Sequence, residues 1–239
     1  MSIVTKPIHY EAATVACNGV CAYDDASSAS RPLILVVHDW SGCNEFVVQK
    51  AKQLAMLGYV GFAIDMYGGG RLGKTKDEKV ALMQPLMQDR HLLLSRIQAA
   101  YQAAKQLPHV DMTKTGVIGF CFGGLCALDL ARSGAPLKGA VSFHGLLTPR
   151  AEKVSDKIHA SILVLHGCQD PMATQETVIT FSHEMQAMQA DYQIYLYGNT
   201  MHAFSNPGAN DPSFGTVYNP LTDKRAWQSM RTFFAEVMG

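Results

Sequence analysis

One cysteine of this chain lies in a frame of glycines between two apolar segments. Residues 119–124 read Gly-Phe-Cys-Phe-Gly-Gly, after the apolar run 116–118 and before a helical pattern over 125–131. A strand, a Gly-x-nucleophile-x-Gly turn and a helix are typical of a nucleophile elbow, in which glycines let backbone segments approach closely. The positive N-terminal end of the helix favours a thiolate there. We therefore predict that Cys121 is a nucleophile, although a free cysteine taken alone is more often a small buried hydrophobic residue.

An acid and a histidine follow in the order that such a nucleophile needs. Asp170 comes after the apolar run 161–165, and His202 follows the next strand candidate, 192–197. In this arrangement the histidine takes up the proton of the nucleophile, and the acid fixes the tautomer and orientation of the imidazole. Taken singly, Asp170 is equally suited to cap a turn and His202 to make a structural hydrogen bond. The order of the three residues, each after its own strand, favours a Cys121–His202–Asp170 triad.

Apolar runs alternate with helical patterns over most of the chain. We expect strands near 8–10, 15–23, 33–37, 59–64, 116–118, 139–143, 161–165 and 192–197. Helices are expected at 45–57, at 77–107 with a break near Pro85, and at 125–131, 174–188 and 223–237. This alternation predicts a mostly parallel sheet covered by helices on both faces. The loops at the C-terminal ends of the strands then meet at one rim, which is expected to hold His38, Cys121, His144, Asp170 and His202.

The composition predicts a single domain in a reducing compartment. The chain has 239 residues, of which 48% are hydrophobic and 17% charged, and its formal net charge is zero. This suffices for one α/β domain over residues 1–239, without the charge excess of a nucleic-acid-binding or membrane-binding protein. We see no run long enough for a membrane span, no signal peptide, and no Cys-x-x-Cys pair among the six cysteines. We expect a cytoplasmic protein that is a monomer or a small homo-oligomer.

Two further motifs carry less weight. Residues 68–73 read Gly-Gly-Gly-Arg-Leu-Gly and match Gly-x-Gly-x-x-Gly. The dinucleotide fingerprint needs a direct strand-to-helix link and a later acid at a strand end, and this segment has neither. We therefore interpret it as a flexible rim loop. His183 lacks the second histidine of a zinc-binding helix, and no other cluster has metal-ligand spacing, so we expect no cofactor and no metal.

With the triad placed, the chain resembles the dienelactone hydrolase family from about residue 8 to the C-terminal helix. The strongest matches are residues 119–124, His166-Gly167-Cys168-Gln169-Asp170-Pro171 and His202-Ala203-Phe204. Weaker matches are residues 40–44 and 63–67, and the aromatic residues of the last helix. The resemblance implies an α/β-hydrolase fold. It also implies a carboxylic ester hydrolase, similar to carboxymethylenebutenolidase, that opens enol-lactones such as dienelactone without a cofactor.

Two positions depart from the pattern of that family. Asp39 stands where the family has a glutamate near the nucleophile, and the loop after His202 lacks the family's arginine for the substrate carboxylate. Asp39 is therefore a candidate for tuning the Cys121 proton or, equally, a loop cap. Arg71 is a candidate anion partner or an exposed, solvated arginine. We expect dienelactone itself to be a poorer substrate than neutral esters.

The predicted chemistry is acyl transfer through a thioester. Cys121 attacks the carbonyl of a small-molecule ester or lactone, and the backbone N–H groups of Phe122 and Trp40 hold the oxyanion. Trp40 and Tyr67 are expected to form walls of the pocket. Two alternatives stay open: an esterase or thioesterase of broad range, and a non-catalytic protein of the same fold that binds a small ligand.

Overall fold

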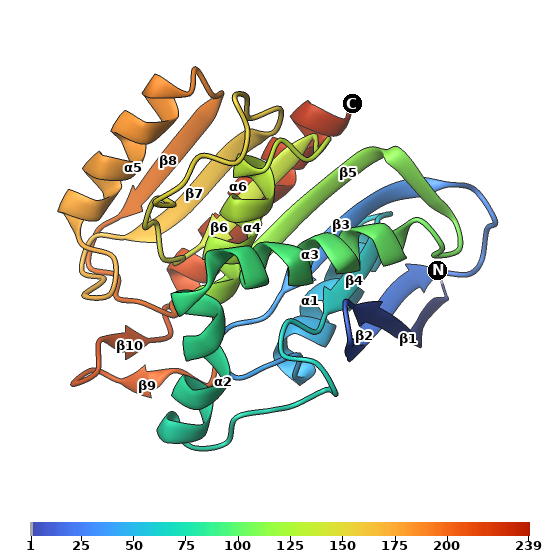
Figure 1. Cartoon of the computed structure of the whole chain (residues 1–239), viewed down its shortest axis with the longest axis horizontal. Coiled ribbons are helices and arrows are strands. Elements are labelled where there is room, and N and C mark those ends of the chain that lie inside the picture. The colour runs from blue at the N-terminus through green and yellow to red at the C-terminus, as the bar shows by residue number, and fades with distance from the viewer. Residues whose placement is uncertain (1) are drawn as a thin grey trace. The chain divides into compact units, whose positions relative to one another are not determined.

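The computed structural model of the protein (Figure 1) describes residues 2–239. The chain forms two compact units. The first unit extends to Val117 and the second starts at Ile118. Strand β5 (Val110–Phe120) therefore begins in the first unit and ends in the second. The expectation of one domain over residues 1–239 stays a prediction.

The first unit joins an antiparallel hairpin to a parallel pair of strands. Strands β1 (Ile3–Ala12) and β2 (Val15–Asp24) form the hairpin, and β4 (Val60–Ile64) pairs antiparallel with β2. Strand β3 (Arg31–Val37) lies parallel to β4, and its residues 33–37 are completely buried. A continuous apolar run suits a strand that is covered on both faces, so the strands predicted near 33–37 and 59–64 are confirmed.

The helices of the first unit follow the sequence prediction with one shift. Helix α1 (Glu45–Met56) matches the expected 45–57, and the helical region expected at 77–107 with a break is two helices, α2 (Lys76–Gln88) and α3 (Arg90–Ala104). The break lies at Asp89, a few residues after the predicted Pro85, which itself lies inside α2. The Asp89 carboxylate accepts hydrogen bonds from the N–H groups of His91 and Leu92 and so caps α3.

The second unit is built on three parallel strands. Strands β6 (Gly139–Phe143), β7 (Ser161–Gly167) and β8 (Tyr192–Tyr197) lie side by side in that order. Helices α4 (Phe122–Arg132) and α6 (Pro220–Met238) both contact β6, and α5 (Gln175–Ala187) connects β7 to β8 (Figure 1). A small ladder of β9 (Asn210–Asp211) and β10 (Thr216–Val217), which the sequence did not predict, lies between β8 and α6.

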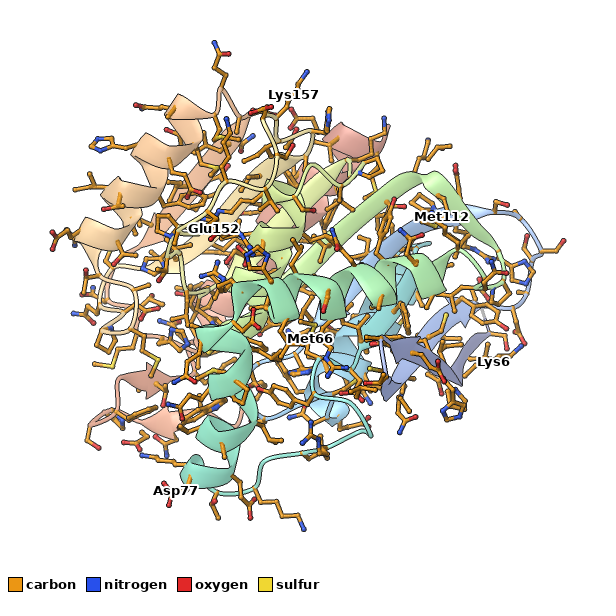
Figure 2. All side chains as sticks on the ribbon, viewed as in Figure 1. Lys6, Met66, Asp77, Met112, Glu152 and Lys157 are labelled. Atoms are coloured by element: carbon orange, nitrogen blue, oxygen red, sulfur yellow. The ribbon has the colours of Figure 1, made fainter. Side chains whose placement is uncertain are left out.

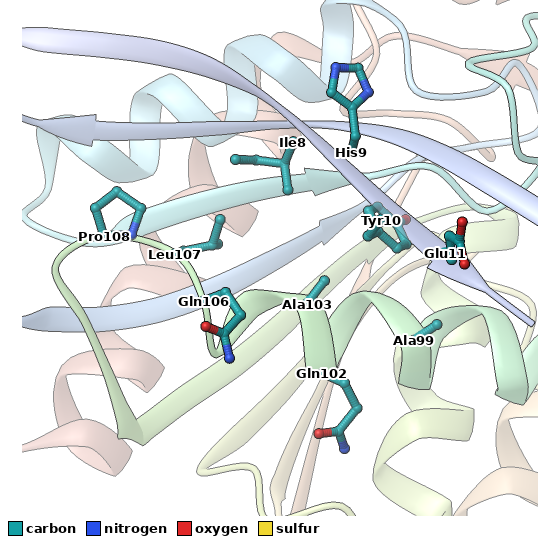
Figure 3. A pocket seen from close by; sticks show the side chains of 10 residues that line it. All are labelled: Ile8, His9, Tyr10, Glu11, Ala99, Gln102, Ala103, Gln106, Leu107 and Pro108. Carbon is teal, nitrogen blue, oxygen red and sulfur yellow. The ribbon is translucent and has the colours of Figure 1, made fainter.

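Side chains fill the interior of each unit, and the first unit also carries an open groove. Met66 lies inside the first unit, whereas Lys6 and Asp77 lie at its surface (Figure 2). The groove, of about 580 Å³, lies between β1 and α3 and is lined by residues such as Ile8, Glu11 and Gln106 (Figure 3). The predicted catalytic residues do not line this groove. In the part of the chain that the structure describes, no helix is both long and apolar enough to cross a membrane.

Candidate active site

Cys121 occupies a strained turn between β5 and α4. The residue has φ 55° and ψ −118°, a backbone conformation that residues other than glycine rarely adopt. Strain of this kind persists only where surrounding structure enforces it, and it is concentrated at functional sites. The Cys121 N–H donates a hydrogen bond of 3.0 Å to the Phe143 carbonyl, which ties the turn to β6. The thiol stays partly exposed at the end of the strand.

Two glycines of the same motif are required by close backbone approach. A Cβ atom at Gly119 would lie 1.9 Å from the carbonyl oxygen of Gly123, inside the first turn of α4. A Cβ atom at Gly124 would lie 2.5 Å from the Ser142 Oγ atom. No side chain fits at either distance. Glycine at both positions therefore lets α4 pack closely against the neighbouring strands, as the sequence predicted.

His202 and Asp170 form a buried pair. The two atoms His202 Nδ1 and Asp170 Oδ2 are 2.7 Å apart, and both side chains are almost completely buried. The other carboxylate oxygen, Asp170 Oδ1, accepts hydrogen bonds from the N–H groups of Met172 and Ala173, at 2.8 Å and 3.1 Å. An acceptor so placed holds the Nδ1–H tautomer of His202 and leaves Nε2 as the reactive nitrogen.

The backbone around His202 is fixed by its neighbours. Its N–H donates to the Gly215 carbonyl and its carbonyl accepts from the Val217 N–H, each at 3.0 Å. These bonds form a bridge between His202 and the strand β10. The small ladder that the sequence did not predict thus holds the loop that carries His202 in position.

Cys121 and His202 interact electrostatically. Burial lowers the pKa of His202, but a negative charge on Cys121 and the hydrogen bond to Asp170 outweigh burial and raise it to about 10. The Nε2 atom itself makes no hydrogen bond of full geometry to the residues that the structure describes. The thiol is therefore close enough to act on the imidazole while its contact is looser than a complete hydrogen bond, as catalytic contacts often are before substrate binds. The arrangement favours the imidazolium form of His202.

Aromatic and polar side chains enclose the His202 ring. His144 packs edge-on against His202, with 5.1 Å between ring centroids, and also against Phe204 at 5.0 Å. The His144 Nε2 atom is 2.8 Å from the Ser205 Oγ atom. His144 directly follows β6 and is buried, and these contacts restrict the orientation of the His202 ring.

The first unit brings together the other loop residues that the sequence singled out. The loop after β3 and the loop after β4 are linked by the Met66 N–H, which donates to His38 Nε2 at 3.2 Å, and by the Tyr67 hydroxyl, which donates to the Trp40 carbonyl at 3.0 Å. Asp39 is buried, and its Oδ1 accepts a hydrogen bond of 2.8 Å from the Ser41 N–H. This is the contact of a loop cap.

Arg71 is exposed, but its guanidinium folds back onto its own loop. It donates to the carbonyls of Tyr67 and Gly68. The loop itself is organised by Asp65, which accepts backbone hydrogen bonds that include those of Gly68 and Gly70. Gly68, Gly69 and Gly70 all have positive φ, so the glycine run serves a tight turn around a carboxylate.

The predicted catalytic residues of the second unit therefore lie together. Phe122 follows Cys121 directly as the first residue of α4 and carries one of the two predicted oxyanion N–H groups. Its predicted partner Trp40 and the substrate candidates Asp39, Tyr67 and Arg71 belong to the first unit, and their roles stay predictions. The described residues hold no cluster of three or more His, Cys, Asp or Glu side chains suited to a metal ion.

Residues 18–238 match the model of the dienelactone hydrolase family. The chain belongs to this family. It is accordingly a carboxylic ester hydrolase with the α/β-hydrolase fold, a mixed and mostly parallel sheet with helices on both faces. The predicted family, fold class and enzyme class are confirmed.

Relatives of this dienelactone hydrolase family member include both sequences and solved structures. A dienelactone hydrolase-like promiscuous phosphotriesterase from metagenomic libraries is 33% identical, with a TM-score of 0.96 over 100% of both chains. A probable 2-oxo-3-(5-oxofuran-2-ylidene)propanoate lactonase from Bradyrhizobium sp is 27% identical over 83% of this chain and 81% of its own. An uncharacterized protein of Caenorhabditis elegans is 38% identical over 60% of this chain and 93% of its own.

Sequence reasoning missed part of what surrounds His202 and Asp170. Ser205 and the bond that His166 makes to Ala173 were not predicted. The signal was present for His166, because it ends an apolar strand and opens the segment that leads to Asp170. Nothing in the sequence marks Ser205, because its partner is 61 residues away along the chain.

Proposed function

We propose that this protein hydrolyses carboxylic esters or lactones through a Cys121–His202–Asp170 triad and a thioester intermediate. The observation that carries the proposal is the buried 2.7 Å contact between His202 and Asp170 together with the action of Cys121 on the same imidazole. The strained backbone of Cys121 adds to it, since it fits a nucleophile elbow.

The first half of the proposed reaction forms the thioester. The Cys121 thiolate attacks the carbonyl carbon, and the carbonyl π electrons move to the oxygen to give a tetrahedral oxyanion. The N–H groups of Phe122 and Trp40 stabilise this oxyanion, and each such donor is worth about 3 kcal/mol of transition-state energy. The intermediate then collapses, the C–O bond to the alcohol breaks, and the His202 imidazolium gives its Nε2 proton to the leaving oxygen. In a lactone the alcohol stays attached to the acyl group.

The second half releases the acid. Neutral His202 takes a proton from water at Nε2, and the resulting hydroxide attacks the thioester carbonyl. The C–S bond breaks, and the carboxylic acid and the Cys121 thiolate are formed, with His202 again an imidazolium. Asp170 stabilises that imidazolium in both halves and does not itself take the proton.

The direct test compares two cysteines of the same region. Cys121→Ala should lower kcat/KM for a simple aryl ester by on the order of 10⁴-fold or more. Cys126→Ala, a buried position on α4, serves as the matched control and should keep wild-type turnover. Asp170→Asn should be severe because it favours the wrong imidazole tautomer, with a loss on the order of 10⁴-fold. Full activity in Cys121→Ala would exclude the proposed nucleophile.

Asp39 and Arg71 are proposed to shape substrate preference. Asp39→Asn keeps an oxygen for the Ser41 N–H and removes only the charge, so a changed pH dependence of turnover would reveal tuning and an unchanged one a loop cap. Arg71→Gln likewise retains donors for the backbone carbonyls but loses the positive charge. It should raise KM for anionic lactones more than KM for neutral aryl esters. We expect dienelactone to be a poorer substrate than neutral esters.

A second candidate activity is phosphotriester hydrolysis. The similarity to a promiscuous phosphotriesterase covers the whole of both chains at 33% identity. In this reaction the Cys121 thiolate attacks phosphorus, an aryloxide leaves, and water then cleaves the P–S bond. Paraoxon turnover that disappears in Cys121→Ala would establish the activity at the same site. A thiol adduct formed once, without turnover of any ester or phosphotriester, would instead favour the non-catalytic binder.

A further inference from the structure

His166 is a buried histidine near the acid of the proposed triad. Its side chain contacts the backbone of Ala173, and the N–H group of Ala173 is hydrogen-bonded to Asp170. It lies near the end of β7, and its side chain is almost completely buried. The Nε2 atom lies 2.7 Å from the carbonyl oxygen of Ala173. The proposed reaction assigns no role to this side chain.

The contact fixes the protonation of the His166 ring. A carbonyl oxygen only accepts, so Nε2 carries the hydrogen and donates it. The Nδ1 atom is buried and has no hydrogen-bond partner among residues 2–239. Burial lowers the pKa of His166, against the charge of Asp170 and the bond to Ala173, so the ring stays neutral.

Packing alone does not account for a histidine at this position. A buried ring nitrogen without a partner costs free energy that an apolar side chain of similar size avoids. A leucine or methionine at position 166 would not donate a hydrogen bond to the Ala173 carbonyl, as His166 does. His166 therefore contributes a directed contact to the turn 170–173.

The same turn holds the acid. The N–H groups of Met172 and Ala173 donate to Asp170 Oδ1, and Asp170 Oδ2 faces His202. Ala173 is thus held by two bonds, from its N–H to Asp170 and from His166 to its carbonyl. A shift of the Ala173 peptide would rotate the Asp170 carboxylate away from His202 Nδ1.

We propose that His166 is a positioning residue that sets the aim of the Asp170 carboxylate at His202 by anchoring the Ala173 carbonyl. The proposal rests on the proposed triad and adds to it one residue, His166, which holds the turn that carries Asp170. It predicts that the strength of the His202–Asp170 contact depends on a hydrogen-bond donor at position 166, and not only on a side chain that fills the space.

Three variants of the full-length protein test this dependence. His166→Leu fills the space without a donor, and His166→Gln restores an N–H donor of similar reach. Val164→Ala, also buried on β7, weakens the packing of the strand without touching the bond to Ala173. For each variant we would record the thermal midpoint, kcat and KM for an aryl ester, and the low-field proton resonance of the His202 Nδ1–H group. Cys121→Ala is measured in parallel.

The expected pattern separates positioning from stability. His166→Leu should lower kcat by about 10- to 100-fold with little change in KM, the usual cost of a catalytic group displaced by a fraction of an ångström to one ångström. The low-field resonance should move upfield or broaden. His166→Gln should recover most of both signals, and Val164→Ala should lower the thermal midpoint while leaving kcat and the resonance as in the wild type.

Other outcomes overturn one proposal or the other. An unchanged resonance and kcat in His166→Leu would refute the positioning role, as would equal losses in His166→Leu and His166→Gln. Retained turnover in Cys121→Ala would refute the proposed triad chemistry. In that case the resonance still reports on whether His166 positions Asp170, so the two failures are distinguishable.

Discussion

Replacing Cys121 by alanine should change the protonation of His202 strongly. The pKa of His202 is about 10 in the folded protein, against an ordinary value of 6.5. The difference corresponds to about 5 kcal/mol in favour of the imidazolium. Burial works against the imidazolium, so the charge on Cys121 and the Asp170 carboxylate together supply the whole of this preference. An opposite charge in contact usually moves a pKa by about 1 to 3 units, and Cys121→Ala removes it.

The sign and size of the change in the pKa of His202 follow from burial and Asp170, which remain in the variant. In Cys121→Ala, burial still lowers the pKa of His202 and Asp170 still raises it. We therefore expect the pKa of His202 to fall by about 1 to 3 units from the wild-type value. Nuclear magnetic resonance titration of the imidazole carbon-bound protons measures this directly, with His202→Gln used to assign the resonance. Cys126→Ala, in which a neighbouring buried thiol is lost, should titrate like the wild type.

Two results would refute the reasoning. The first is a wild-type His202 that titrates near its ordinary pKa, which would mean that the thiol and the imidazole do not form an ion pair. The second is a pKa of His202 that is raised but is the same in Cys121→Ala, which would assign the effect to Asp170 alone.

Further predictions test the cysteines, the glycine frame and a buried histidine. Brief iodoacetamide treatment should label Cys121 first among the three partly exposed cysteines, Cys43, Cys121 and Cys168. Burial raises the pKa of the Cys43 thiol to about 12, which slows its reaction. Mass mapping shows which cysteine reacts, and prior labelling of Cys168 or Cys43 with activity retained would argue against the assignment. Gly119→Ala should destabilise the fold by about 1–3 kcal/mol through overpacking, whereas Gly198→Ala, with no heavy atom within 4 Å of its added Cβ, should leave the denaturation midpoint unchanged. Burial lowers the pKa of His38 in the folded protein below its ordinary value of 6.5. Below that pH the unfolded chain therefore binds more protons than the folded protein, and the free energy of unfolding should decrease as the pH drops. His38→Gln should reduce that slope by up to about 1.4 kcal/mol per pH unit, measured by urea unfolding between pH 5 and 7; an unchanged slope would show that His38 does not titrate on unfolding.

Local patterns in the sequence were sufficient for the central strands and for the position of Cys121 in the turn between β5 and α4. Strand β3 is a continuous apolar run, and such a run is buried on both faces wherever it folds. The Cys121 motif is also local, because the glycines on either side must admit the backbone of α4 at short range. The order of Asp170 and His202 could be predicted because each residue lies in the loop that follows its own strand.

Other features depend on contacts that no local pattern records. Asp89 becomes a helix cap only because the backbone leaves helical geometry there, whereas the sequence signal for a break was Pro85. The pairing of β10 with His202 joins segments that carry no strand pattern. The bond from His166 to Ala173 requires a turn whose shape is set by Asp170. Each of these features is set by tertiary contacts, and the sequence around the residues involved does not reveal those contacts.

The most direct test of the central claim is to trap the acyl-enzyme. The protein is mixed with 4-nitrophenyl acetate in excess, quenched in acid within the first turnover, digested, and mapped by mass spectrometry. We predict an acetyl group on the Cys121 peptide, formed together with a burst of nitrophenolate and lost on incubation at neutral pH. Turnover of the ester without acylation of Cys121, or with the acetyl group on another residue, would contradict the thioester mechanism.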